Sequence, residues 1–173
     1  MSFYLLPRVI GAVLLGAAFA VRRSAARRRG ELEVAAGLEV LRTLRWKEFA
    51  QYVTQSFEAR GYNAETGQRR PGEDGVDIVL TRSGERLLLQ VKHGGSYLVG
   101  GGPVRALAGM LAAHGANAGV IATSGAFDAA ALDAARERQV TLLAGEPLWN
   151  GLRGLLPDSL VAEVDERAGE TAG

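Results

Sequence analysis

A run of three leucines, Leu87 to Leu89, ends in the polar pair Gln90 and Lys92, and this feature constrains the fold more than any other. Three consecutive leucines leave no polar face, so the strand that they predict is buried on both sides within a sheet. Because strand side chains alternate, Gln90 and Lys92 project from one face and Val91 from the other. A lysine in that place lies at the rim of a cleft or costs desolvation energy.

Helix and strand patterns alternate along the rest of the chain, which predicts an α/β domain with a mixed sheet flanked by helices, in the order αβββαβ. The turn Arg82–Glu85 joins two strands as a hairpin, and Pro103 marks the first turn of a later helix. The expected elements are helices over 41–57, 103–114 and 127–138, strands over 62–66, 76–81, 86–92, 119–123 and 140–143, and a short helix with a polar tail after residue 149.

The composition narrows the possible chemistry. There is no cysteine, which excludes disulfides, thiolate zinc sites and cysteine nucleophiles. The cations are 18 arginines and two lysines, so the positions of Lys47 and Lys92 are informative. The net charge of +1 hides a split, since residues 1–30 hold six arginines and no acid, and the rest holds 14 basic and 19 acidic side chains. Any affinity for nucleic acid must therefore come from a local patch.

The N-terminal segment predicts an apolar helix that anchors the chain in a membrane. Residues 3–21 are apolar apart from Pro7 and Arg8, close to the length that crosses a bilayer. Five arginines within 22–29 follow, and the positive-inside rule puts them and the domain on the cytoplasmic side of a single-pass cell-membrane protein. A cleaved signal peptide and a soluble or interfacial helix remain alternatives. The expected division is an anchor with its basic flank over 1–30, a connector over 31–40, a folded domain over 41–149 and a C-terminal helix and tail over 150–173.

Candidate catalytic side chains meet where the two hairpin strands pair. Asp77 stands at the start of one strand, and Gln90 and Lys92 stand at the end of the other, so antiparallel pairing brings them side by side. A carboxylate and an amide oxygen suit Mg²⁺, which takes few protein oxygens and adds waters and phosphate oxygens. Such a metal lowers the pKa of bound water. Lys92 could orient or deprotonate that water, or neutralise charge on a phosphate.

Structural roles compete with this interpretation. Asp77 could cap the preceding loop, and Lys92 could form a structural ion pair with Asp77. The spacing D-x12-Q-x-K is too loose to establish an enzyme by itself.

A longer set of motifs resembles the Mrr-type restriction endonuclease family, in one order over residues 41–149. These motifs are Leu44–Phe49, Gly61-Tyr62, Glu73–Asp77, Leu89–Lys92, Val99-Gly100, Val120–Phe127 and Gly145–Leu148. The resemblance implies a restriction-endonuclease-like core with a PD-(D/E)xK site in its Q-x-K variant, DNA as substrate and Mg²⁺ as cofactor. It makes Asp77 the metal-binding aspartate, Gln90 the substitute for the usual acid, with Asp77 and Gln90 as metal ligands, and Lys92 the catalytic lysine.

The first helix departs from the family pattern. The family usually has a glutamate directly after the helix phenylalanine, where this chain has Ala50. Glu48 lies two residues earlier, about 200° around a helix, and would point elsewhere. Glu73 and Asp74 are nearby acids whose expected role is loop solvation. The site is therefore expected to lack one supporting carboxylate.

The remaining candidates are contacts to nucleic acid. Arg69, Arg70 and His93 are possible phosphate contacts, although His93 is expected to face outward after a core strand. Thr123 and Ser124 are expected to cap the helix that follows them. Cutting both DNA strands would need two sites, which makes a homodimer plausible.

Three functions are compatible with these observations. The favoured one is a membrane-tethered, Mg²⁺-dependent DNA endonuclease. The second is a nuclease-fold module that binds nucleic acid or a protein partner without cleavage. The third is a membrane protein whose domain has no connection with nucleic acid.

Overall fold

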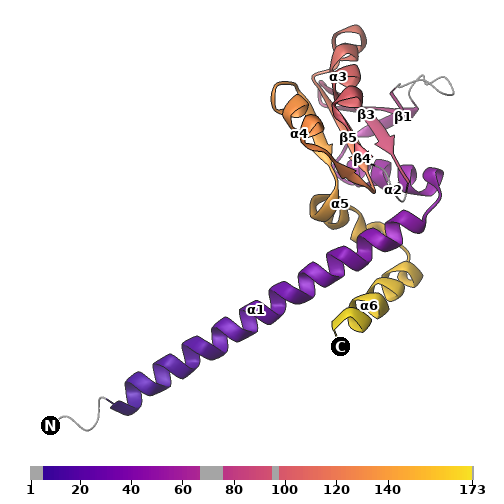
Figure 1. Ribbon diagram of the computed structural model, residues 1–173. Helices are drawn as coiled ribbons and strands as arrows, with labels where there is room; N and C mark the ends of the chain where they lie inside the picture. Colours follow the sequence, from indigo (N-terminus) through magenta and orange to yellow (C-terminus); the bar gives the residue numbers. More distant parts are fainter. Residues whose placement is uncertain (1–5, 67–75, 95–97, 173) are drawn as a thin grey trace.

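A five-stranded mixed sheet forms the centre of the domain (Figure 1). The computed structural model describes residues 6–66, 76–94 and 98–172, with side chains described only between residues 22 and 171. The strand order is β1-β2-β3-β5-β7, with β1, β2 and β3 antiparallel and β3, β5 and β7 parallel. The strands are β1 (Asn63–Thr66), β2 (Ile78–Arg82), β3 (Glu85–Lys92), β5 (Ala118–Thr123) and β7 (Val140–Leu143). The predicted α/β domain with a mixed sheet is confirmed.

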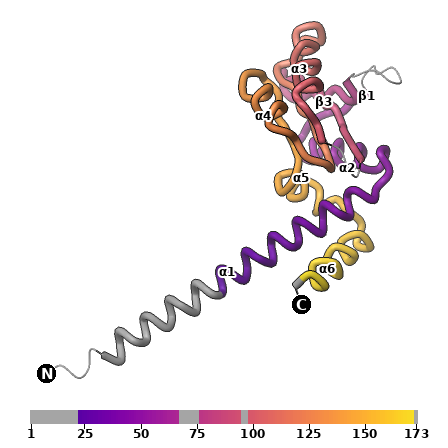
Figure 2. The backbone as a smooth tube through the Cα atoms, in the orientation of Figure 1, coloured from indigo at the N-terminus to yellow at the C-terminus, as the bar shows by residue number. Residues whose placement is uncertain are grey.

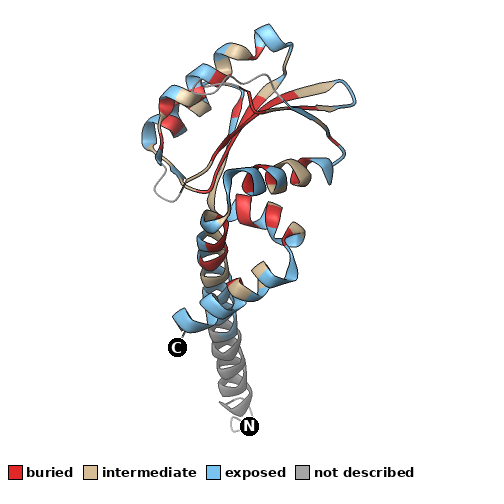
Figure 3. Cartoon of the chain, turned by 90° about the vertical axis from the view of Figure 1, so that its right-hand side faces the viewer, coloured by how far each residue is buried: buried red, intermediate tan, exposed pale blue. Residues whose placement is uncertain are grey.

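The leucine run lies in β3, at the middle of the sheet, where helices cover both faces (Figure 3). Leu87 and Leu89 face a core built with Phe49, Val53 and Leu148. Leu88 faces the other core, built with Val104, Leu107 and Ala131. The first core is closed by α2 (Trp46–Glu58) and α5 (Gly145–Leu152), and the second by α3 (Gly101–Met110) and α4 (Ala129–Arg136).

A tight hairpin sets the register of β2 against β3. Its two central residues, Ser83 and Gly84, have φ angles of 48° and 85°. Positive φ at both positions matches the right-handed twist of the flanking strands, and glycine adopts it without a steric penalty. The register pairs Arg82 with Glu85 and Ile78 with Leu89.

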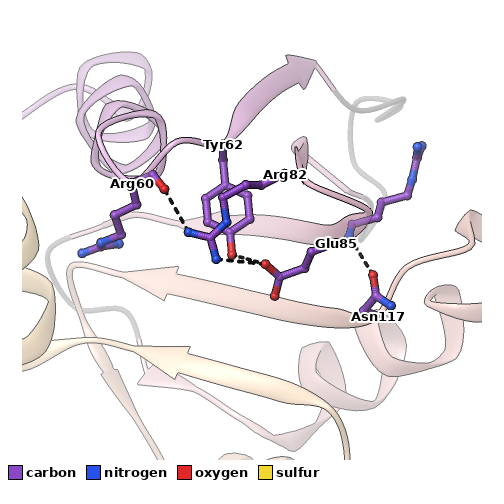
Figure 4. A network of polar contacts seen from close by, with 6 residues as sticks. Arg60, Tyr62, Arg82, Glu85 and Asn117 are labelled. Atoms are coloured by element: carbon purple, nitrogen blue, oxygen red, sulfur yellow. Dashed lines mark hydrogen bonds and ion pairs between the residues drawn. The ribbon is translucent and has the colours of Figure 1, made fainter.

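The turn end of the hairpin is held by a polar network (Figure 4). Tyr62 donates a hydrogen bond to Glu85 Oε2 at 2.5 Å, and Arg82 forms an ion pair with the same oxygen at 3.2 Å. The Arg82 guanidinium also lies 4.2 Å from the centre of the Tyr62 ring and donates to the carbonyl of Arg60 at 2.9 Å. The Glu85 hydrogen bond, followed by burial, raises the pKa of Tyr62 above its ordinary value. This network ties α2 and β1 to the hairpin.

Two long helices extend the domain beyond the sheet. The first, α1 (Leu6–Thr43), runs away from the domain as one continuous helix, and α6 (Asp158–Ala172) packs beside its C-terminal half (Figures 1 and 2). Residues 31–40 belong to α1. Within the described residues, no helix combines the length and the apolar character that crossing a membrane requires. Because the side chains before residue 22 lie outside the described residues, the apolar N-terminal helix stays a prediction.

Several boundaries differ from the sequence-based expectation. The helix expected over 41–57 is interrupted, because α1 ends at Thr43 and α2 begins at Trp46. The expected polar tail is helical in α6, with Val164 buried in the core. A small parallel pair, β4 (Leu98–Val99) and β6 (Ala126–Phe127), was not expected, and neither were α5 and the short 3-10 helices Ala112–His114 and Arg153–Leu155.

Candidate active site

The structure brings Asp77, Gln90 and Lys92 to one end of the β2–β3 pair. Asp77 directly precedes β2, and its N–H donates at 3.0 Å to the carbonyl of Leu89, the register partner of Ile78. The Asp77 backbone therefore lies beside the residue that precedes Gln90 in β3. Lys92 is the last residue of β3. The three side chains are only 6%, 0% and 8% exposed.

The Asp77 carboxylate is oriented by the strand that carries the other two residues. Its Oδ2 accepts a hydrogen bond from the Val91 N–H at 2.6 Å. β2 begins at Ile78, and the carboxylate before it supplies an acceptor for the N–H of the buried residue Val91. Asp77 thus has a structural bond in addition to its predicted catalytic role.

The site faces the α3 and α4 side of the sheet. Gln90 and Lys92 alternate with Val91, which lies in the core with Phe49 on the α2 side. The parallel neighbour β5 pairs Lys92 with Thr123. Thr123 is fully buried, and its hydroxyl accepts from the N–H of Gly125 at 3.0 Å.

His93 occupies a place that the sequence did not indicate. Its ring stacks on Phe49, with 4.6 Å between ring centres and a 19° interplanar angle. Nε2 lies 2.6 Å from the carbonyl oxygen of Leu44, and Nδ1 lies 2.8 Å from the hydroxyl of Ser124. The expectation that His93 faces outward is wrong, because it shares the α2 face of the sheet with Val91. Its predicted phosphate contact gains no support here, since both ring nitrogens meet protein atoms.

One proton arrangement satisfies this cluster. A ring protonated at Nε2 donates to Leu44 and accepts at Nδ1 from Ser124, whose oxygen also receives the N–H of Gly94 at 3.4 Å. The carbonyl of Ser124 accepts in turn from Arg42 Nε at 3.0 Å. The cluster therefore joins the end of α1 to the residues that directly follow β3 and β5.

The predicted cap at Thr123 and Ser124 is wrong. The helix begins later, at Ala129, and Asp128 caps it by accepting from the N–H of Ala131 at 2.7 Å. The strand β6 separates Ser124 from this helix, so the Ser124 hydroxyl is used by His93 instead.

No acid of α2 reaches the site. Ala50 is buried in the core, and Glu48 accepts from the N–H of Arg45 at 2.9 Å, which caps the start of α2. Glu58 lies at the far end of the helix. The predicted candidates Arg69, Arg70, Glu73 and Asp74 lie outside the described residues. Among the residues that are described, no three histidine, aspartate or glutamate side chains gather as a metal site.

The donor set nevertheless suits one metal type. Magnesium keeps several waters and is usually held by one or two carboxylates together with substrate phosphate oxygens. The Asp77 carboxylate and the Gln90 amide oxygen, both on buried residues at this end of the sheet, would form such a sparse all-oxygen set. A thiolate or multi-histidine metal would find no ligands here.

Trp46 is a neighbour of the site that was not singled out from the sequence. Its indole Nε1 donates to the carbonyl of Val91 at 3.4 Å, while 41% of the residue remains exposed. The interruption between α1 and α2 places Trp46 at the first turn of α2, at the surface. Trp46 could have been identified from the sequence only by recognising this interruption between the two helices.

Comparison with known proteins identifies the family and the fold of the domain. Residues 41–151 match the Mrr_cat family model, described as a restriction endonuclease. No curated protein sequence matches the chain. The fold resembles that of the DNA modification-dependent restriction endonuclease AspBHI, with a TM-score of 0.52 and 22% identity over 80% of this chain and 40% of that one.

Two further structures are more distantly similar, both with a TM-score of 0.46. The protein of unknown function AF1548 is 21% identical over 65% of this chain and 58% of its own, and MspJI, solved with a 27-mer oligonucleotide, is 18% identical over 91% and 34%. The chain thus spans less than two thirds of each of these structures. Because the family model matches more than half of the chain, the chain belongs to the Mrr-type restriction endonuclease family.

Proposed function

We propose that this protein is a Mg²⁺-dependent endonuclease that hydrolyses DNA phosphodiester bonds with Asp77, Gln90 and Lys92. The observation that carries the proposal is the buried convergence of these three side chains at the end of β3, within a domain of this family. AspBHI, which has the same fold, is a DNA-cleaving restriction enzyme by name, and this supports DNA as the substrate class.

Burial favours a functional role over a merely structural one. A strand that holds Leu87, Leu88 and Leu89 could end in apolar residues at no cost in packing. Instead it ends in an amide and an ammonium group, both nearly buried, and burying such groups costs free energy unless they are well paired. A few polar groups that converge within apolar surroundings are typical of catalytic and binding sites.

Each residue has a distinct part in the proposed reaction. The Asp77 carboxylate, oriented by the Val91 N–H, and the Gln90 amide oxygen would hold Mg²⁺. When bound, the metal supplies Lewis acidity and lowers the pKa of a coordinated water. The Lys92 ammonium donates hydrogen bonds to phosphate oxygens and stabilises the negative charge that grows on them. The net reaction adds water across one P–O bond.

The membrane tether is a proposal that rests on the sequence and on the continuity of α1. The arginines at 22–29 lie on the same helix that enters the domain, and each of them is exposed. We propose that the segment before them holds the domain at the cytoplasmic side of a membrane. Fractionation of cells that express the full chain tests it: recovery in the membrane pellet supports a tether, and recovery in the supernatant contradicts it.

The enzymatic proposal is tested with supercoiled plasmid and the full chain. Incubation with Mg²⁺ is expected to produce nicked or linear DNA, and EDTA is expected to prevent it. Ca²⁺ is used in place of Mg²⁺ to measure DNA binding separately from cleavage. Binding of DNA with no cleavage under Mg²⁺ or Mn²⁺ would select the non-catalytic module instead.

A further inference from the structure

At least six of the twelve lysines and arginines described beyond residue 30 are ion-paired. Six arginines form ion pairs with neighbouring acids, and these are Arg42, Arg82, Arg136, Arg138, Arg153 and Arg167. The chain beyond residue 30 is also net acidic. A polyanion such as DNA therefore gains little from the surface as a whole, and its attraction must come from cations that carry no acidic partner.

Such cations occur together at the start of α2. Arg45 and Lys47 are exposed and flank Trp46, itself 41% exposed. Within the described part of the chain, no acid forms an ion pair with Arg45 or Lys47. The one acid beside them, Glu48, is engaged by the Arg45 N–H. We call these three side chains, Arg45, Trp46 and Lys47, the Trp46 surface.

The Trp46 surface is fixed to the catalytic strand. The Trp46 indole donates to the carbonyl of Val91, and the N–H of the same Val91 donates to Asp77. The residue before the surface, Leu44, bonds His93 through its carbonyl. The surface therefore lies at the same end of β3 as Lys92, on the α2 side of the sheet.

The chemistry of the surface fits a nucleic acid. Two cations can neutralise neighbouring phosphates, and an exposed indole can pack against a sugar or a base. A purely apolar partner would leave Arg45 and Lys47 unmatched. Exposure of a large aromatic side chain between two cations, next to a proposed phosphodiesterase site, points to the substrate itself.

We propose that the Trp46 surface binds the DNA substrate next to the cleaved bond. Arg45 and Lys47 contact backbone phosphates, and Trp46 packs against the adjoining nucleotide. This inference rests on the proposed function, because it assumes that DNA enters the site of Asp77 and Lys92.

Fluorescence provides the first test, since the chain has two tryptophans and Trp149 is buried. The full chain is titrated with a DNA duplex in Ca²⁺, as wild type, as Trp149→Phe and as Trp46→Phe. DNA is expected to change the emission and to reduce acrylamide quenching in the wild type and in Trp149→Phe, but not in Trp46→Phe. The comparison of wild type with Trp46→Phe decides the question even where Trp149→Phe does not fold.

Salt dependence provides the second test. Lys47→Gln and Arg45→Gln are each expected to weaken DNA binding and to lower the slope of log K against log salt by about 1. Arg167→Gln on α6 removes a cation that is also exposed but is ion-paired, and it is expected to leave the slope unchanged. Circular dichroism checks that α2 is intact in each variant.

The outcomes distinguish a failure of this inference from a failure of the proposed function. Absence of DNA binding at low salt overturns both. Binding with an unchanged Trp46 signal and unchanged slopes in Lys47→Gln and Arg45→Gln overturns the inference alone and leaves the nuclease standing. A Trp46 response to anionic vesicles, with none to DNA, also overturns it in favour of a lipid surface.

Discussion

The Asp77 carboxylate accepts a hydrogen bond from the backbone N–H of Val91, with 2.6 Å between Oδ2 and N. Val91 lies between Gln90 and Lys92, so a single bond relates the proposed metal ligand to the strand that carries its two partners. Asp77 consequently contributes to the fold through an acceptor atom and to the proposed chemistry through a negative charge. Different substitutions separate these two contributions.

Asp77→Ala removes the acceptor and leaves the buried Val91 N–H unsatisfied, which is expected to lower the free energy of unfolding by about 1–3 kcal/mol. Asp77→Asn retains an oxygen acceptor and is expected to be less destabilising. Urea denaturation of both variants measures the difference. Equal stabilities would show that the hydrogen bond contributes nothing.

His93→Phe keeps an aromatic ring to stack on Phe49 but removes the bonds to Leu44 and Ser124. The part-buried Leu44 carbonyl and the hydroxyl of the buried Ser124 lose a partner, so we expect a loss of about 1–3 kcal/mol in unfolding free energy. Cleavage is expected to slow, because His93 directly follows Lys92. The matched control is His114→Ala, an exposed site whose change is expected to stay within about 0.5 kcal/mol. Similar behaviour of the two variants would contradict the role of His93.

Gly37→Ala tests how α1 docks on α5. A Cβ atom at Gly37 would lie 2.5 Å from ring carbons of Trp149, so the two helices must move apart. We expect a loss of about 1–3 kcal/mol and a change in Trp149 emission. Gly30→Ala lies on the same helix with nothing within 4 Å, and its better helix propensity is expected to stabilise by about 0.5–1 kcal/mol. A stabilising Gly37→Ala would mean that α1 does not pack there.

The raised pKa of Tyr62 predicts that the stability of the protein depends on pH. The pKa of Tyr62 is raised in the folded protein, chiefly by the hydrogen bond to Glu85, so the folded state holds the proton more tightly than the unfolded state. This contribution is fully present below the ordinary value of 10.0 and is lost as pH rises through the folded pKa. Tyr62→Phe is therefore expected to be less stable than the wild type at pH 8, and the gap is expected to narrow above pH 10. A gap that stays constant in denaturation series at both pH values would exclude this linkage.

The sequence was most informative where structure is local. The leucine run and the turn at Ser83-Gly84 predicted β2, β3 and their pairing, because both signals lie within a few residues of what they determine. That pairing alone brought Asp77, Gln90 and Lys92 together. The assignment of their catalytic roles came from family resemblance, and those roles stay predictions.

Features set by distant contacts were missed. The apolar spacing continues from Leu41 through Leu44 to Phe49, so nothing local announces the break between α1 and α2. The break brings the Leu44 carbonyl to His93, 49 residues later, and is capped by Glu48. The β4–β6 pair has two residues in each strand, too few for a periodic pattern. His93 was misplaced because the residue after a strand was expected to turn to solvent, whereas it continues the buried face of Val91.

The central claim is most directly tested by Mg²⁺-dependent plasmid cleavage with wild type, Asp77→Asn and Lys92→Gln under single-turnover conditions. The account predicts that each variant binds DNA in Ca²⁺ and keeps the wild-type circular dichroism spectrum, but cleaves at least about 100-fold more slowly, as expected when a group that stabilises the transition state is lost. The control Arg167→Gln is expected to cleave like the wild type. Wild-type cleavage by Asp77→Asn, or by Lys92→Gln, would contradict the assignment of this site.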